Sequence, residues 1–133
     1  MNPHYPEVSH RAAHRCEYCH APEVIFNFPF EVEHVIPVCH NGIDELANLA
    51  LACRSCNLHK ASHLTGFDKV AQQETGLFNP RRDHWEDHFR VDKETGAILS
   101  ETGIGRATVA RLNMNRETQL AARLQWMRLG LFP

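Results

Sequence analysis

The order of hydrophobic and polar residues in the first half of the chain predicts a strand, a loop, a second strand and a helix. Residues 24–28 and 31–36 are rich in β-branched and aromatic side chains, which is typical of strands. Residues 38–46 contain an Asn-Gly pair and are predicted to form a loop. Residues 49–52 are apolar and are predicted to form a further short strand. Residues 54–63 have the composition of a helix and are predicted to form one.

The second half shows a weaker pattern that ends in two helices. Residues 66–87 have no clear periodicity and are predicted to be irregular, whereas residues 88–100 suggest a hairpin with its turn at residues 93–96. Residues 103–112 and 116–129 are predicted to be helical. In the last segment three apolar residues share one helix face and are expected to pack on the first half: Leu120, Leu124 and Met127.

A length of 133 residues suits one compact domain, or a small domain with an extension. We divide the chain into a core of residues 1–66 and an extension of residues 67–133, which comprises a loop, a short hairpin and two helices packed on the core. No apolar stretch reaches the length of a signal peptide or of a bilayer span, so we expect a soluble, cytoplasmic protein without membrane contact.

The charge of the chain is small overall and uneven. The net charge is −2 with histidine neutral, which does not draw the whole protein onto polyanions. Residues 1–100 carry 9 Lys/Arg against 14 Asp/Glu, whereas residues 101–133 carry five arginines and two glutamates. Any surface that binds phosphate is therefore local, and the C-terminal segment is one candidate for it.

Five cysteines are present, and four of them form two Cys-x-x-Cys pairs separated by 33 residues. Two tight turns that each offer two sulfurs match a tetrahedral zinc site, and no open position remains for catalysis. A short helix over residues 9–15 is predicted to deliver the first pair. A redox dithiol or buried apolar cysteines are the alternatives. Cys39 is the spare cysteine, and the expected ligands of a structural Zn²⁺ are Cys16, Cys19, Cys53 and Cys56.

Between and after these pairs the chain reads EHVIP, then ANL, then CNLHK. This order resembles the HNH endonucleases, also called ββα-metal nucleases, in the branch with a zinc site of two cysteine pairs. The resemblance covers about residues 11–65. It implies an α+β fold, in which a small zinc-stabilised ββα-metal domain is followed by a helical C-terminal extension.

The resemblance also implies roles for four residues. His34 would be the general base that activates water, and Asn48 would fix the loop and orient that base. Glu33 and Asn57 would bind the catalytic Mg²⁺ or Mn²⁺. Most relatives have Asp or His at the position of Glu33, which is longer by one methylene than Asp.

Phosphodiester hydrolysis requires these residue types on chemical grounds as well. A neutral histidine takes a proton from water near physiological pH, and oxygen ligands suit a hard divalent cation. Because neighbouring residues of a regular strand point to opposite faces, bringing Glu33 and His34 to one phosphate requires a bulge or a strand end there.

Other residues are weaker candidates. His40, His59 and Lys60 could contact the phosphates of a nucleic acid, and His59 with His63 could form a metal pair on one helix face. A second possible metal cluster lies in the irregular segment: Asp83, His84, Asp87 and His88. For each of these side chains, taken singly, a solvent-exposed or packing role is the simpler interpretation.

The predicted function is hydrolysis of DNA to give 5′-phosphate and 3′-hydroxyl ends. The resemblance places the hairpin and helix in the minor groove, where backbone contacts dominate, so sequence preference should be weak. A non-catalytic zinc module that binds nucleic acid or protein is the first alternative, and an RNase-type toxin is the second. The oligomeric state and the target are left open.

Overall fold

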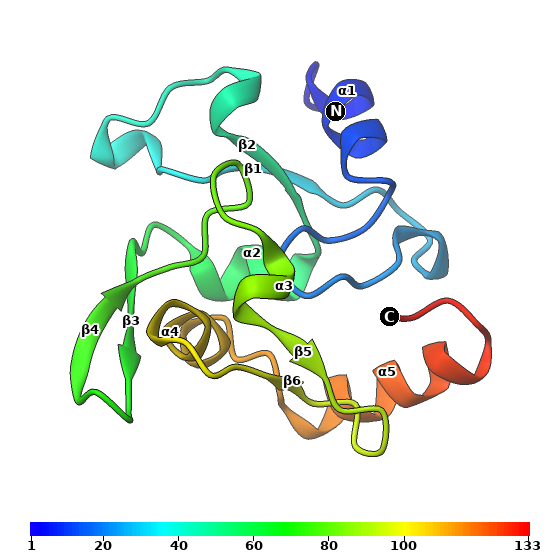
Figure 1. Ribbon diagram of the computed structural model, residues 1–133. Coiled ribbons are helices and arrows are strands. Elements are labelled where there is room, and N and C mark those ends of the chain that lie inside the picture. The colour runs from blue at the N-terminus through cyan, green and yellow to red at the C-terminus, as the bar shows by residue number, and fades with distance from the viewer.

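The structure is a computed structural model that describes residues 1–133. Three separate two-stranded antiparallel sheets and five helices make up the fold, which is α+β as predicted (Figure 1). None of its helices has the length and apolar character needed to cross a membrane.

The first half is built on a hairpin of β1 (Glu31–His34) and β2 (Leu49–Ala52). Every residue of β2 is buried, because the strand lies between α1 (Tyr5–Arg11) and α2 (Arg54–Lys60) (Figure 1). The register pairs Glu33 with Ala50 and His34 with Leu49, without a bulge. β1 therefore ends at His34, two residues before the end predicted from the sequence, and this strand end does not bring the side chains of Glu33 and His34 together.

The predicted strand at residues 24–28 is wrong. The chain forms a single 3₁₀ turn at Glu23–Ile25 instead. The Glu23 carboxylate accepts hydrogen bonds from the Phe30 amide at 2.7 Å and from the Tyr5 hydroxyl at 2.8 Å. These bonds hold the segment as a loop, and Val24 is left exposed with no strand to pair with.

Residues 66–87 are more regular than predicted. The strands β3 (Thr65–Asp68) and β4 (Gln73–Gly76) form a hairpin, and the single-turn helix α3 (Trp85–His88) follows. The exposed strand β4 has no hydrophobic alternation, so its sequence gave no strand signal. Only tertiary packing against α4 reveals it.

The last elements agree with the predictions. The short hairpin of β5 (Arg90–Val91) and β6 (Ile98–Leu99) is followed by α4 (Gly103–Arg111) and α5 (Glu117–Arg128). α4 lies against β3, where an added Cβ on Gly66 would come within 2.2 Å of the Ala107 carbonyl oxygen. Glycine at residue 66 therefore permits this close approach.

Both halves of the chain contribute to one hydrophobic core. The core joins Tyr18 and Leu51 of the first half to Phe78, Phe89 and Met114 of the second. The chain end returns to the first half, where the Arg15 guanidinium donates to the Leu131 carbonyl at 2.8 Å. Loss of structure in one half should therefore expose core surface of the other.

Candidate active site and metal centre

Four buried cysteines converge at the junction between the N-terminal turn and α2. All four sulfurs lie within 4.8 Å of one another, and none forms a disulfide. A tetrahedral zinc site with Zn–S bonds of ~2.3 Å places neighbouring sulfurs about 3.8 Å apart. The distance between the sulfurs of Cys19 and Cys53 is 3.7 Å. The residues present therefore fit a structural zinc ion: Cys16, Cys19, Cys53 and Cys56.

Local backbone geometry explains why the two pairs point at one place. The Cys19 amide faces the Cys16 sulfur at 3.5 Å, and the Cys56 amide faces the Cys53 sulfur at 3.4 Å. In the second pair this contact also caps the start of α2. Cys39 is exposed and takes no part, as predicted from its position.

A buried arginine of α5 lies beside the cysteine cluster. Arg123 is 1 % exposed, and its guanidinium donates to the carbonyl oxygens of Gly96 and Met114 and to the Asn115 side chain, none of which is charged. Burial lowers the pKa of Arg123, and the cysteine sulfurs oppose that shift. Four thiolates around a divalent ion would carry a net charge of −2, and Arg123 would compensate part of that charge from the C-terminal helix.

His34 lies at the end of β1 and carries the side chain that the sequence assigned as the base. Its Nε2 is 3.0 Å from the Oδ1 atom of Asp44, and the imidazole is partly exposed. The other oxygen of Asp44 lies 4.0 Å from His4 Nε2. Asp44 was not singled out from the sequence, because a lone carboxylate in a loop ten residues away follows no spacing rule.

Glu33 points to the other face of the hairpin and is buried. Its carboxylate accepts a hydrogen bond from the Tyr18 hydroxyl and pairs with the Lys60 ammonium at 3.1 Å. Lys60 also donates to the carbonyl oxygens of His34 and Val35, at 3.2 and 2.9 Å. Burial raises the pKa of the Glu33 carboxyl, and Lys60 opposes the shift.

This arrangement does not fit a divalent cation at Glu33. Each oxygen of the Glu33 carboxylate already accepts a hydrogen bond, and the ammonium of Lys60 lies where a metal ion bound to this carboxylate would be. Lys60 is 2 % exposed, which also leaves it little access to a phosphate. The assignment of Glu33 as a metal ligand remains a prediction that requires Lys60 to release it.

The two asparagines differ in how they are held. The Asn48 side chain accepts from the Ile36 amide at 2.9 Å and donates to the carbonyl oxygens of Ile36 and Ile43, both at 2.9 Å. It therefore ties the residues that follow the base to the loop that carries Asp44. Asn57 lies on α2, is partly exposed and makes no side-chain hydrogen bond within the protein, so its amide oxygen is free for a ligand.

The remaining histidines do not gather around an ion. Among histidine, cysteine and carboxylate side chains, the four cysteines form the only group of three or more that is close enough to hold one. His59 faces the Ser55 carbonyl through Nδ1 at 2.8 Å, and His40 is exposed on a 3₁₀ turn. In the segment 83–88, His88 faces the Thr102 hydroxyl at 2.8 Å, which gives it a partner inside the fold.

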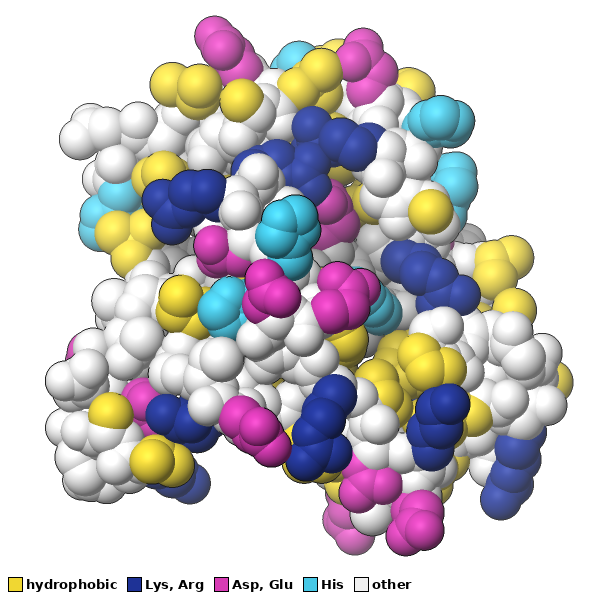
Figure 2. All heavy atoms as spheres, viewed as in Figure 1, with side chains coloured by type: hydrophobic (Ala, Val, Ile, Leu, Met, Phe, Trp, Pro, Cys, Tyr) yellow, Lys and Arg dark blue, Asp and Glu magenta, His cyan; other side chains and the backbone are white.

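The C-terminal arginines do not form a phosphate track. Arg106 pairs with Asp68 at 2.7 Å, and Arg123 is buried, so both serve the fold. On the face shown in Figure 2, Lys and Arg side chains alternate with Asp, Glu and His, and they do not form a continuous stripe.

The Glu33–Lys60 pair allows a direct test of its structural role. We expect Lys60→Met to lower the free energy of unfolding by ~3–5 kcal/mol, because it leaves a carboxylate buried without its cation. The measurement is urea denaturation with zinc present. The double variant Glu33→Gln/Lys60→Met should recover most of the loss, and equal stability of Lys60→Met and the wild type would contradict the role.

The hairpin of β1 and β2 and the helix α2 form a small α+β arrangement, which holds four clustered cysteines that fit a zinc ion and a histidine at the end of its first strand. Residues 16–63 match the HNH endonuclease family. This segment is similar to that family, and its clustered cysteines are consistent with the branch that has two Cys-x-x-Cys pairs. Neither a curated protein nor a solved structure matches the chain.

Proposed function

We propose that the protein is a metal-dependent endonuclease that hydrolyses phosphodiester bonds of DNA, with His34 as the general base. The family match over residues 16–63 carries this proposal. Support comes from the partly exposed imidazole of His34, which lies at the end of β1 and is paired with a carboxylate.

The contact with Asp44 sets which nitrogen of His34 acts. A carboxylate can only accept, so Nε2 carries the proton while the bond is made, and Nδ1 keeps its lone pair. In the proposed reaction Nδ1 takes a proton from water and the hydroxide attacks phosphorus. The bond from phosphorus to the 3′ oxygen breaks, and the 3′ alkoxide takes a proton from solvent water to become a 3′ hydroxyl. His34 then releases the proton on Nδ1 to solvent.

The divalent cation implied by the family supplies charge neutralisation at the phosphate and the leaving oxygen when it is bound. Asn57 offers a free oxygen for it, whereas Glu33 becomes a ligand only after Lys60 moves away. Asn48 keeps the loop of Asp44 against the end of β1, which is a positioning role.

Asp44 can be tested as the residue that orients the base. We expect Asp44→Asn to lower kcat by about 10- to 100-fold with little change in KM, because an amide can donate to Nε2 and favour the wrong tautomer. Steady-state cleavage of a labelled duplex measures this, and ¹⁵N NMR of the His34 ring reports its tautomer.

The neighbouring carboxylate provides the control for this variant. Glu45 is exposed and lies next to Asp44, so Glu45→Gln should leave both kcat and the tautomer unchanged. Equal behaviour of the two variants would show that Asp44 does not orient the base.

Two alternatives are separated by cleavage assays. Supercoiled plasmid and structured RNA are incubated with the wild-type protein and with His34→Ala, in Mg²⁺ or Mn²⁺ and without either. A DNA nuclease nicks the plasmid only with the metal and only with His34. A non-catalytic zinc module gives no metal-dependent cleavage, and an RNase-type toxin cleaves the RNA in preference.

A further inference from the structure

A cavity without acidic lining opens next to the backbone that follows His34. It has a volume of ≈ 210 Å³ and lies between the end of β1 and the segment that follows β4. This volume is several times the ~30 Å³ that a water molecule takes up in the liquid. Its polar side chains come from both halves of the chain: Lys60, His63, Asn79 and Arg82.

Arg82 gives this cavity a positive charge that the protein does not neutralise. Its side chain is exposed and has no hydrogen-bond or ion-pair partner within the protein. The adjacent Arg81 differs, because it pairs with Glu17. His63 is also exposed and makes no side-chain hydrogen bond, whereas Lys60 is paired with Glu33.

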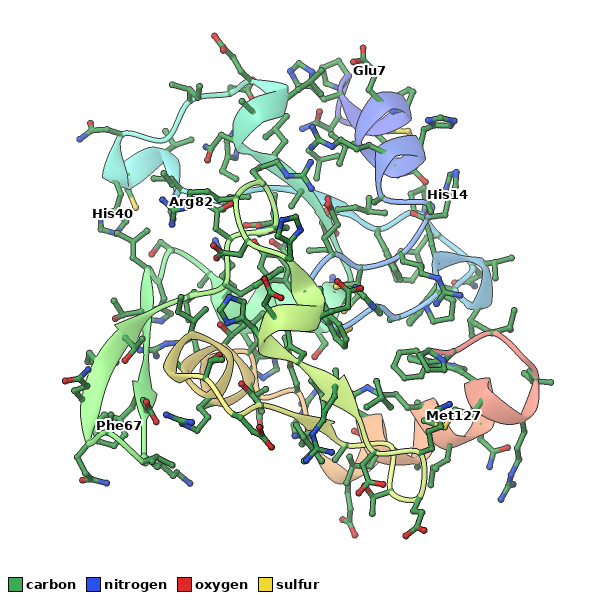
Figure 3. The ribbon with its side chains drawn as sticks, in the orientation of Figure 1. Glu7, His14, His40, Phe67, Arg82 and Met127 are labelled. Carbon is green, nitrogen blue, oxygen red and sulfur yellow. The ribbon has the colours of Figure 1, made fainter.

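The position of the cavity connects it to His34. Val35 and Ile36 line it, and they are the two residues that follow the proposed base. Figure 3 shows Arg82 on the side of the molecule where His40 lies, on the loop after β1. Lys60, which also lines the cavity, donates to the His34 carbonyl at 3.2 Å. A phosphate subsite here requires that a strand with its scissile phosphate at His34 passes around the end of β1.

We propose that this cavity is a phosphate subsite, in which Arg82 and His63 bind a backbone phosphate of DNA next to the scissile bond. The inference rests on the proposed function and adds a contribution of the C-terminal segment to substrate binding. A guanidinium with all donors free matches phosphate geometry, and phosphate contacts position a duplex without reading its sequence.

The test measures DNA binding without cleavage. Fluorescence anisotropy with a labelled duplex is recorded over a range of salt concentrations, with zinc retained and no other divalent ion added. For the wild type, log K falls linearly with log salt, with a slope of about −0.9 per phosphate contact. We expect Arg82→Gln to weaken binding about fivefold and to reduce the slope by about one contact.

Three further variants sharpen the result. Arg82→Lys retains the charge and should keep the slope, and His63→Asn should weaken binding. Arg128→Gln removes an exposed arginine of α5 that does not line the cavity, and it should change the affinity by less than Arg82→Gln. Equal slopes for the wild type, Arg82→Gln and Arg128→Gln overturn the subsite.

The source of the phosphate and the proposed function are tested separately. Binding of inorganic phosphate, seen by NMR at His63, with an unchanged DNA slope in Arg82→Gln would identify a free-phosphate site and overturn the proposal. If Arg82→Gln reduces the salt slope by about one contact but the wild type never cleaves DNA, the subsite is supported and only the proposed nuclease activity is contradicted. Cleavage of DNA together with equal salt slopes for the wild type and Arg82→Gln would support the nuclease and overturn the subsite.

Discussion

Removal of zinc is expected to unfold the protein, not only its first half. Apparent binding energies for structural zinc sites in peptides are ~10–16 kcal/mol, whereas the total stability of a domain is ~5–15 kcal/mol. The cysteine cluster joins the N-terminal turn to α2, and the core that it supports includes Phe78 and Met114 of the second half. Loss of the ion should therefore remove the cooperative transition of the whole chain.

Circular dichroism and thermal melting in the presence of a strong zinc chelator measure this effect, and re-addition of zinc should restore the signal. Cys53→Ser should behave like the chelated protein. Cys39→Ser is the matched control, because that cysteine is exposed and lies outside the cluster. A metal-free protein that melts like the zinc-loaded one would show that the cysteines are only packing residues.

The central hairpin, α2 and the cysteine cluster were predictable because each has a local signal. Two Cys-x-x-Cys turns specify the candidate ligands, Val32 with the following Val35 and Ile36 indicates a strand at β1, and the second cysteine pair marks the start of α2. The last two helices also carry their own signals. In α5, however, the side chain that packs most deeply is Arg123, which no hydrophobic pattern indicates.

The strand at residues 24–28 and the hairpin β3–β4 were not predictable for the same physical reason. The strand-like composition around Val24 does not produce a strand without a partner strand. The hydrogen bonds to the Glu23 carboxylate hold this segment as a loop instead. At β4 the reverse holds, since a polar segment becomes a strand because β3 and α4 lie beside it. Both outcomes depend on tertiary neighbours that a local pattern does not contain.

The candidate active site could also be predicted only in part, because the contacts of its side chains depend on tertiary neighbours. The family pattern gives Glu33 and His34 adjacent roles, and the strand sends them to opposite faces. Lys60 was named from the sequence as a candidate for phosphate contact, but it is buried and pairs with the carboxylate of Glu33, because a buried carboxylate requires a cation. Asp44 is found only through the loop that Asn48 folds back onto the end of β1.

Replacement of His34 by alanine should have the largest effect on activity of any single change away from the zinc ligands. A general base contributes about 10²- to 10⁴-fold to rate, which corresponds to ~3–5 kcal/mol of transition-state stabilisation. The loss should fall on kcat with KM nearly constant, because the imidazole acts on water and does not hold the duplex. Plasmid nicking under single-turnover conditions measures this loss, with zinc content and melting temperature confirming that the fold is intact.

His10→Ala is the control, since His10 is an exposed histidine on α1. Equal cleavage by both variants would remove His34 as the base, and the partly exposed His59 of α2 would then become the histidine to replace.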